Sequence, residues 1–429
     1  MRILFLSHYY PPEVNAPANR VSQLARAWAA DGHDVTVLTG FPNHPTGIVP
    51  PAYRGRPYIR HEIDCGVHVA RTPIYAAPNK HILRRSLNYS SYSVSAATIG
   101  PFITGCPDVV VATSPQFLTA VAGYAVARVK RVPFVLEVRD LWPASIVDVG
   151  AMRPGSPVVR ALEAAERFLY RHADHIVVVT DSFVESIAAH GIPRGKISVV
   201  KNGVDLEMFR SGPTENAVRE RLGLRDKFVA AYIGTHGLAH GLGTILEAAA
   251  LLRGDDRYRF LLIGDGAEKR GLQERAALEG LANVLFLDQL PHEAIPEHVR
   301  AADVTLVMLR DRALFRSVIP SKIFEFMGAA RPIVIGVDGE ARRLVEDAGA
   351  GVFVPPEDAT TLAGTLRRLD GDAAARSRMG QSGRAFVERH FSRQAQARLY
   401  LEHLDRIVRP VRRHPVSLAA PAARTAHLE

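Results

Sequence analysis

The sequence predicts an α/β protein made of two doubly wound parallel sheets. Its 429 residues are enough for two to three domains. A hydrophobic fraction of 47% and a charged fraction of 23% are ordinary for a globular chain, and they exclude disordered, collagen-like and coiled-coil proteins. Short apolar runs alternate with helical patterns along the chain, which is typical of parallel strands joined by crossover helices.

Six short apolar runs predict the sheet of the N-terminal half. The first run is too short for a signal peptide, and turn residues follow it at once, so it is interpreted as a buried strand. Helical patterns at Val21–Ala30 and Leu162–Tyr170 separate some of the runs. The segment from Gly40 to Arg60 is predicted to be a long loop of the kind that is functional or mobile. The predicted strands are Ile3–Leu6, Val35–Leu38, Val67–Ala70, Val109–Ala112, Phe134–Val138 and Ile176–Val179.

A second series of strands begins near Phe228. Helical patterns at Leu242–Leu252, Lys269–Glu279 and Ile323–Ala329 lie between them. The apolar pattern lapses at Ser211–Thr214, which marks the boundary between the halves. We expect domains at 1–205 and 206–390, a helix at 391–412 that returns to the first domain, and a disordered tail at 413–429. The predicted strands are Val229–Ile233, Phe260–Ile263, Val284–Leu287, Val304–Met308, Ile333–Ile335 and Val352–Val354.

Cysteine content and hydropathy favour the cytoplasm. Cys65 and Cys106 are too few for a disulfide scaffold or a four-cysteine zinc site, so a reducing compartment is expected. No run of about 18 uncharged apolar residues is present, which predicts no membrane-spanning helix.

The net charge of +9 leaves several classes of partner open. No basic run with interleaved aromatics and no helix-turn-helix or zinc-finger spacing is present, so nucleic acid is not expected. The segment Lys80–Val94 is basic and aromatic, and it contains Arg84 and Arg85 but no acidic residue. It predicts either a helix that lies on an anionic membrane surface or an ordinary surface helix.

Several catalytic motifs are absent. The first strand is not followed by G-x-G-x-x-G, which argues against a dehydrogenase. Asp370-Gly371-Asp372 follows a helical pattern and is interpreted as a turn, so no metal site is predicted there. No paired H-x3-H beside a glutamate and no G-x-S-x-G elbow occur, which argues against a zinc hydrolase and a serine hydrolase.

The segment from Ser317 to Ile335 carries the clearest chemistry. Pro320 suits the first turn of a helix, whose unpaired N–H groups would form a phosphate site with the charge of Lys322. Glu325 lies about one turn further, where a carboxylate can accept two hydrogen bonds from a diol. Phosphate beside a sugar diol describes a nucleotide ribose. The alternative is a glutamate that merely favours the helix dipole above a buried face.

This segment resembles that of the retaining glycosyltransferases of family 4, which have the GT-B fold. Their marker is E-x7-E just before a helix, followed by P-[IV]-[IV]. Glu325 matches the second glutamate, and Arg331-Pro332-Ile333-Val334 completes the motif, but Ser317 replaces the first glutamate. This replacement, with Ile319-Pro320-Ser321-Lys322, is similar to a bacterial subgroup of surface-polysaccharide enzymes that includes colanic-acid and fucosamine transferases.

Further matches extend the resemblance over nearly the whole chain. Asn202-Gly203-Val204-Asp205 is similar to the interdomain segment of the family, and Gly264-Asp265-Gly266 to the loop beside the donor nucleotide. Arg139-Asp140-Leu141-Trp142-Pro143 matches a marker of the subgroup. The loop Gly234–Gly241 departs from the family, because many members hold Arg and Lys for the diphosphate where this chain has Thr235 and His240.

The resemblance implies a role for each candidate site residue. In the family the first acid of the motif contacts donor-sugar hydroxyls, so we expect Ser317 near the sugar. Asp140 is expected to orient the acceptor hydroxyl. The expected catalytic set is Ser317, Asp140, Arg139 and Lys322. The expected donor-binding set is Glu325, Ser321, Lys322, Ile319, Pro320, Gly234, Thr235, His236, His240, Gly264, Asp265, Gly266 and Asn202. The expected acceptor-side set is Asn15, Ala16, His8 and Trp142.

The function implied is transfer of a sugar from a nucleotide diphosphate-sugar, a UDP- or GDP-sugar, with retention of configuration. The Rossmann-like domain 1–205 would hold the acceptor, and 206–390 the donor. The expected acceptor is a polyprenyl-diphosphate-linked sugar or an oligosaccharide in cell-surface polysaccharide synthesis. No metal and no cofactor beyond this co-substrate are expected, and the enzyme would be cytoplasmic or peripheral at the membrane's inner face. Two alternatives stay open: a nucleotide-sugar epimerase of the same architecture and a non-catalytic sugar-nucleotide-binding protein.

Overall fold

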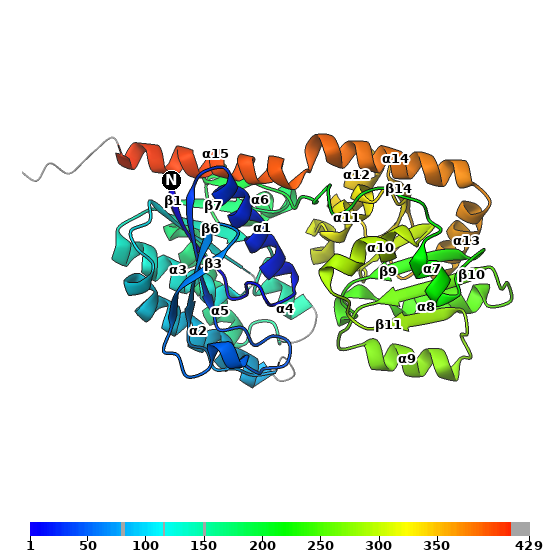
Figure 1. Cartoon of the computed structure of the whole chain (residues 1–429), viewed down its shortest axis with the longest axis horizontal. Helices are drawn as coiled ribbons and strands as arrows, with labels where there is room; N and C mark the ends of the chain where they lie inside the picture. Colours follow the sequence, from blue (N-terminus) through cyan, green and yellow to red (C-terminus); the bar gives the residue numbers. More distant parts are fainter. Residues whose placement is uncertain (79–81, 115, 149–151, 413–429) are drawn as a thin grey trace, which may run out of the picture.

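The computed structural model describes residues 1–78, 82–114, 116–148 and 152–412. Within these ranges the chain folds into two α/β halves, each built on its own sheet (Figure 1). The first sheet has eight strands and the second has six. The predicted fold class of two doubly wound sheets is therefore confirmed.

The sheet of the N-terminal half is ordered β3-β4-β2-β1-β5-β6-β7-β8. Its strands are parallel except for β3, which pairs antiparallel with β4. The chain winds outward from β1 through β2 in one direction and then through β5 in the other. The strands are β1 (Arg2–Leu6), β2 (Asp34–Gly40), β3 (Ile59–Asp64), β4 (Val67–Thr72), β5 (Val109–Thr113), β6 (Phe134–Val138), β7 (His175–Val178) and β8 (Ile197–Val199).

The sheet of the C-terminal half is ordered β11-β10-β9-β12-β13-β14 and is parallel throughout. The winding direction reverses between β9 and β12. The strands are β9 (Phe228–Ile233), β10 (Tyr258–Ile263), β11 (Val284–Leu287), β12 (Val304–Met308), β13 (Ile333–Gly336) and β14 (Gly351–Phe353).

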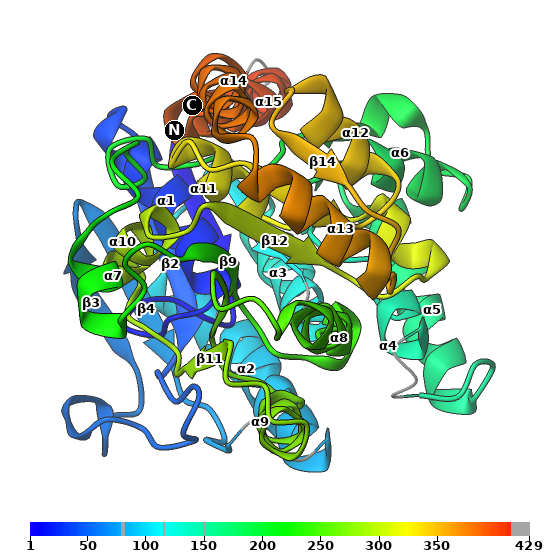
Figure 2. The same ribbon diagram turned by 90° about the vertical axis from the view of Figure 1, so that its right-hand side faces the viewer.

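Helices cover both faces of each sheet. In the N-terminal half, α2, α3, α5 and α6 share one core and α1 and α15 share the other. In the C-terminal half, α8, α9 and α13 lie together on one side (Figure 2), and residues of α11 and α12 form the core on the other. The helices are α1 (Ala16–Ala30), α2 (Ile82–Ile103), α3 (Phe117–Lys130), α4 (Ala144–Asp148), α5 (Pro157–His172), α6 (Asp181–Ala188), α7 (Ala217–Leu222), α8 (Gly243–Leu252), α9 (Lys269–Leu278), α10 (Ile295–Arg300), α11 (Lys322–Gly328), α12 (Glu340–Asp347), α13 (Ala359–Asp370), α14 (Ala373–His390) and α15 (Arg393–Arg412).

The two last helices run along one side of both halves (Figure 1). α14 lies on the C-terminal half, and α15 packs on α1 of the N-terminal half. The indole N–H of Trp28 donates to the carbonyl of Ala397 at 3.0 Å, and the ring of Trp28 meets that of Tyr400 edge-on. Because these side chains are fully buried, α15 is part of the N-terminal core.

Some expectations from the sequence need correction. Two edge strands, β3 and β8, were not predicted. Most residues of β3 are polar, and β8 has only three residues. The expected loop from Gly40 to Arg60 therefore ends where β3 begins, at Ile59. Helix α11 begins at Lys322, so Pro320 precedes the helix and does not lie in its first turn. The expected tail at 413–429 and Lys80 lie outside the described residues.

In the part of the chain that the structure describes, no helix is both long and apolar enough to cross a membrane.

Candidate functional site

The candidate donor site lies where the winding of the C-terminal sheet reverses. Ligands of open α/β sheets bind outside the carboxyl ends of the strands at such a point. Here the reversal lies between β9 and β12, and Gly234 follows β9 directly. Lys322, at the start of α11, reaches this edge, since a Cβ on Gly234 would overlap the Lys322 ammonium.

Lys322 and Glu325 are a half-buried pair of opposite charge on α11. The Lys322 ammonium lies over the ring of Tyr232, 4.0 Å from its centroid. Burial lowers the pKa of Lys322 to about 7 and raises that of Glu325 to about 7, while each charge partly offsets the shift of the other. Among the described residues neither side chain makes a hydrogen bond, so both are free to bind a ligand.

Two glycine loops pack against each other beside this pair. Gly264 and Gly266 follow β10 with φ of 145° and 158°, a region that favours glycine. A Cβ on Gly264 would overlap the carbonyl oxygen of Gly234, and one on Gly266 would overlap the backbone of His236. The backbone N–H of His236 donates to the carbonyl of Asp265 at 2.9 Å. The sequence-predicted loops after β9 and β10 are thus brought into direct contact.

The two histidines of this region are uncharged near neutral pH. Burial, together with the charge of Lys322, lowers the pKa of His236 and of His240 to about 4. His240 lies against the carbonyl of Gly237, with its Nδ1 3.2 Å away. His236 is fully buried, and both its ring nitrogens lack a partner among the described residues. Because buried polar atoms are normally hydrogen-bonded, these nitrogens mark a place for a water or a ligand atom.

The other predicted donor residues are held by hydrogen bonds to the backbone, exposed at the start of α11, or packed in the core. The Tyr232 hydroxyl donates to the carbonyl of Thr235 at 2.8 Å, and the Gly266 N–H donates to the Asp265 carboxylate at 2.8 Å. Ser321 is exposed as the N-cap of α11 without a side-chain capping bond. Ile319 points instead into the core of the C-terminal half.

Ser317 lies on a short 3-10 helix, η5 (Ala313–Ser317), at the junction of the two halves. Its hydroxyl donates to the carbonyl of Leu314 at 2.6 Å. η5 contacts α4 and α6 of the N-terminal half, and Leu314 packs against the N-terminal core. A serine here is therefore held by its own helical turn and not by a charged partner.

Arg139 and Asp140 follow β6 at the carboxyl edge of the N-terminal sheet. One guanidinium nitrogen of Arg139 lies 3.4 Å from the carbonyl of Ala16, and another is buried without a partner among the described residues. Burial lowers the pKa of Arg139 to about 10 and raises that of Asp140, which accepts a hydrogen bond from Ser145 at 3.0 Å.

Asn15 caps α1 beside Ala16. Its side-chain oxygen accepts from the N–H of Ala18 at 2.9 Å, while its amide nitrogen is buried and unpartnered in the described ranges. The structure thus brings Asn15, Ala16 and Arg139 together. Their unpartnered donors are suited to a hydroxyl or phosphate oxygen.

Three other predicted residues are placed elsewhere. Trp142 stacks on Phe117 with centroids 5.4 Å apart, which is a packing contact. Asn202 lies in the connection between the halves and accepts from Arg20 at 3.0 Å. His8 is buried among aromatic rings, where desolvation lowers its pKa to about 3.

Sequence reasoning missed two residues that act on the charged pair. Tyr232 faces Lys322, but in the sequence it is only one of several apolar residues of a strand. Arg393 begins α15, yet its charge lowers the pKa of Glu325. The guanidinium of Arg393 also pairs with Asp205 at 3.0 Å. No local pattern links positions 325 and 393, so only the fold reveals this contact.

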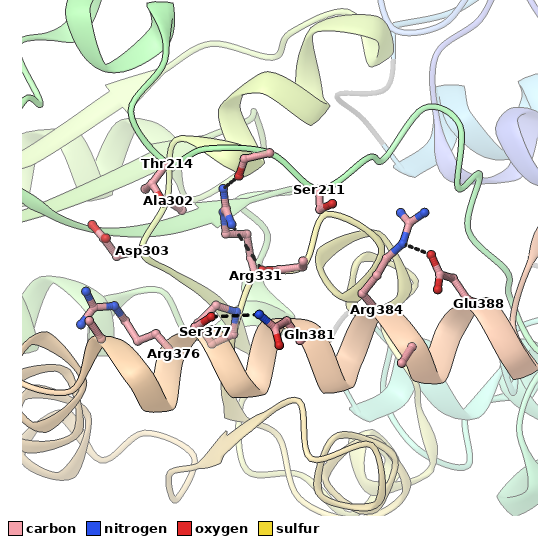
Figure 3. Close-up of a pocket in the computed structure, with 15 residues that line it drawn as sticks. Ser211, Thr214, Ala302, Asp303, Arg331, Arg376, Ser377, Gln381, Arg384 and Glu388 are labelled. Carbon is pink, nitrogen blue, oxygen red and sulfur yellow. Dashed lines mark hydrogen bonds and ion pairs between the residues drawn. The ribbon is translucent and has the colours of Figure 1, made fainter.

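A cavity lies beside α14, away from these residues (Figure 3). Its empty volume is about 1250 Å³, a figure that includes open solvent at its mouth. Asp303 and Pro332 in its wall precede β12 and β13, so it lies at the amino edge of the sheet, opposite Gly234. Arg331 donates to the carbonyls of Gly212, Arg300 and Ala330. This cavity is therefore not the candidate site.

Metal ligands are not gathered in the described part of the chain. No group of three His, Cys, Asp or Glu side chains there is placed to hold an ion. Asp370 ends α13, and Asp372 caps α14 by accepting from Ala375 N–H at 2.8 Å.

Comparisons with known proteins agree with this architecture. Residues 15–203 match the family described as glycosyl transferase 4-like domain, and residues 215–386 match glycosyl transferases group 1. WcaI of Escherichia coli K12, named for a glycosyl transferase role in colanic acid biosynthesis, is 26% identical over 86% of this chain and 92% of its own length. The α-D-kanosaminyltransferase of Streptomyces kanamyceticus is 27% identical over 60% of this chain and 67% of its own length.

Solved structures share the fold. HepE of Anabaena, solved with UDP and glucose, superposes with a TM-score of 0.72 over 94% of this chain and 99% of its own, at 18% identity. WaaG, a glycosyltransferase involved in lipopolysaccharide biosynthesis, superposes with a TM-score of 0.67 over 94% and 99%, at 16% identity. The protein is thus an enzyme of the glycosyltransferase class, has the GT-B fold, and belongs to the group 1 glycosyltransferases of family 4, which use nucleotide-sugar donors.

Proposed function

We propose that this enzyme transfers a sugar from a UDP-sugar to a lipid-linked or oligosaccharide acceptor during synthesis of a cell-surface polysaccharide, with retention of configuration. UDP is favoured because HepE was solved with UDP and with UDP-glucose. The acceptor class is favoured by the subgroup-like segment Ser317–Lys322 and by the similarity to WcaI over most of both chains. Retention follows the family.

The pair formed by Lys322 and Glu325 is the observation that carries this proposal. Lys322 and the backbone N–H of Ser321 would bind the diphosphate, and the Glu325 carboxylate would accept from the ribose diol. The glycine loops after β9 and β10 leave room for the nucleotide backbone because they carry no side chain. His236 and His240 are neutral there, so Lys322 would supply the charge that many relatives obtain from Arg and Lys.

The chemistry requires stabilisation of a leaving diphosphate. A preorganised ammonium and backbone N–H groups can supply this with little reorganisation. In a front-face reaction the leaving phosphate would accept the proton of the acceptor hydroxyl. Arg139 and Asn15 would face the sugar or acceptor from the N-terminal half, Asp140 would orient the hydroxyl, and Ser317 would lie near the donor sugar. Closure of the halves would exclude water.

A thermal-shift panel of nucleoside diphosphates and their sugars tests the donor site. UDP should raise the unfolding midpoint, because a ligand that binds only the native state stabilises it. Glu325→Ala should abolish that rise. Glu274→Ala, an exposed glutamate of α9, should retain it. If no nucleotide shifts the wild-type midpoint, the proposal fails. If UDP-sugar binds and is interconverted without an acceptor, the epimerase alternative replaces it. If UDP-sugar binds but no turnover is detected, the binding-protein alternative replaces the proposal.

We also propose a cytoplasmic enzyme that contacts the membrane through α2. One face of this helix exposes Arg84 with Leu87, Val94 and Phe102, whose exposed fractions are 52%, 63% and 82%. Apolar side chains next to a cation suit the surface of an anionic bilayer. Such contact would bring a lipid-linked acceptor to the N-terminal half.

Flotation with vesicles tests the membrane contact. Combining Arg84→Glu with Leu87→Ser should reduce binding to vesicles rich in anionic phosphatidylglycerol and leave UDP affinity unchanged. Arg160→Glu, an exposed arginine of α5, is the matched control and should bind as the wild type does. Equal binding of the double variant and the wild type would remove the membrane contact from the proposal.

A further inference from the structure

A small hollow opens at the carboxyl edge of the N-terminal sheet, apart from the residues already discussed. It measures about 220 Å³ only when the solvent at its mouth is counted, and its interior has room for about one water molecule. Its walls come from segments that follow three parallel strands and from the first two turns of α2. The lining residues are Tyr9, Asn43, His44, Ala77, Arg85, Asn88 and Tyr89.

Buried hydrogen bonds hold the walls of the hollow rigidly. The side-chain oxygen of Asn88 accepts from Nε2 of His8 at 2.9 Å, and its side-chain nitrogen donates to the Asn43 side chain at 3.0 Å and to the carbonyl of Tyr75 at 2.8 Å. The carboxylate of Glu13 accepts from the N–H groups of Asn43 and His44, both at 2.9 Å. These bonds join the ends of β1, β2 and β4 to α2. The site is therefore preorganised.

Arg85 contributes an uncompensated charge to this hollow. It is half-buried and has neither an ion pair nor a hydrogen bond within the described ranges. Its charge reaches Tyr9, whose hydroxyl is hydrogen-bonded to that of Tyr89. The Nδ1 atom of His44 is buried and has no partner among the residues described, and burial lowers its pKa. An unpaired guanidinium beside hydroxyl and imidazole groups is suited to an oxyanion.

The neighbouring arginine, Arg84, lies in different surroundings. Arg84 is exposed, and the helical repeat places it on the same face as Leu87 and Val94. Arg85 shares the inner face with the buried Asn88 and Tyr92. Two consecutive arginines thus point to different surroundings, which provides a matched pair for experiment.

We propose that the mouth of this hollow binds an anionic group, a phosphate or a carboxylate, carried by the saccharide acceptor, with one oxygen of that group inside the hollow. Arg85 would pair with the anion, and Tyr9, His44 and Tyr89 would hydrogen-bond its oxygens or adjacent sugar hydroxyls. The inference rests on the proposed transfer to a saccharide and narrows the acceptor to a charged one. A phosphate could belong to a lipid diphosphate or to a sugar phosphate, and a carboxylate to a uronic acid.

Titration calorimetry on the full chain, with UDP at saturation to fill the donor site, tests the inference. The probes are glucose 6-phosphate, glucuronic acid and farnesyl diphosphate, with glucose as the neutral control. At least one anionic probe should bind more tightly than glucose. Arg85→Ala should weaken that binding about tenfold or more, as expected for loss of a hydrogen bond to a charged group. Arg84→Ala should bind the probe as the wild type does, and Arg85→Lys should regain part of the affinity.

The probes distinguish the sources of the anion. If only farnesyl diphosphate binds, the anion is assigned to a lipid diphosphate. If only glucose 6-phosphate binds, it is assigned to a sugar phosphate, and if only glucuronic acid binds, to a carboxylate. Equal binding of glucose and the anionic probes overturns the inference, as does equal loss in Arg84→Ala and Arg85→Ala. UDP affinity is measured in each variant, because a variant that still binds UDP as the wild type does is folded. Failure of UDP itself to bind wild-type protein would instead refute the proposed donor site.

Discussion

At the scale of single residues, Lys322 is a cation beside Gly234 in the candidate donor site, while His240 is neutral. We therefore expect Lys322→Ala to weaken UDP binding by about 1.5–3 kcal/mol, the range for a hydrogen bond to a charged group. His240→Ala should change it by much less, because a neutral imidazole adds no charge. Calorimetric titration with UDP measures both, and a larger loss in His240→Ala would contradict the assignment.

The lowered pKa of Lys322 predicts a pH dependence of donor binding. In the free enzyme this pKa is about 7, so the ammonium is lost as the pH rises above that value. If UDP requires the charged form, its apparent affinity falls with the charged fraction, about 16-fold from pH 7 to pH 8.5. Lys322→Arg keeps its charge throughout and should not show this fall. Glu325 ionises over the same range in both proteins, so their difference isolates Lys322. Parallel pH profiles would argue against the role of Lys322.

At the scale of elements, the contact between the loops after β9 and β10 depends on glycine. Alanine at position 264 would adopt a φ of 145° and overlap the Gly234 carbonyl. We expect Gly264→Ala to cost about 1–3 kcal/mol in unfolding free energy and to weaken UDP binding. Gly271→Ala is the control: a Cβ there meets nothing within 4 Å in α9. It should stabilise the helix by about 0.5–1 kcal/mol. Urea unfolding measures the stability of both variants, and titration with UDP measures their affinity. Unchanged UDP affinity in Gly264→Ala would contradict a donor role for the loops.

The sequence could predict the buried elements but not the edges. Strands such as Val109–Thr113 are buried on both faces and form continuous apolar runs, so hydropathy alone locates them. β3 has the sequence Ile-Arg-His-Glu-Ile-Asp, and its pairing with β4 is a tertiary interaction that no local pattern reports. The start of α11 was misplaced because Pro320 suits a helical turn but precedes this one.

The candidate site was predicted only where its residues are close in sequence. Lys322 and Glu325 lie in one motif, and the glycine loops follow recognisable strands. The effect of Arg393 on Glu325 and the hollow around Arg85 depend on segments that are far apart in the sequence, and Tyr232 is a strand residue with no polar signal. Such contacts arise from topology, because the carboxyl ends of parallel strands meet at one edge.

At the scale of the whole molecule, one side chain joins the two halves. Glu340, at the start of α12, is 5% exposed. Its carboxylate accepts from the N–H groups of Asp181 and Ser182, both at 2.9 Å, and from the Ser182 hydroxyl at 2.7 Å. Lys201 lies 3.3 Å away. The carboxylate thus occupies the N-terminus of α6, where the helix dipole favours a negative charge. This contact is one of those that join the halves in the arrangement of Figure 1.

Removing this carboxylate should loosen the halves. Glu340→Ala leaves the N–H groups of Asp181 and Ser182 without their partner, while Lys201 keeps its ion pair with Asp181 at 2.6 Å. Such a loss typically costs about 2–5 kcal/mol at a buried charged contact. We expect a larger radius of gyration in small-angle X-ray scattering and separate unfolding of the halves in urea. Glu346→Ala, on the exposed side of the same helix, removes only a surface pair with Arg342 and should behave as the wild type does. UDP should still bind Glu340→Ala, because the donor residues lie within the C-terminal half, whereas transfer should slow because it needs both halves. An unchanged radius and a single unfolding transition would show that other contacts, such as η5 against α4 and α6, hold the halves together.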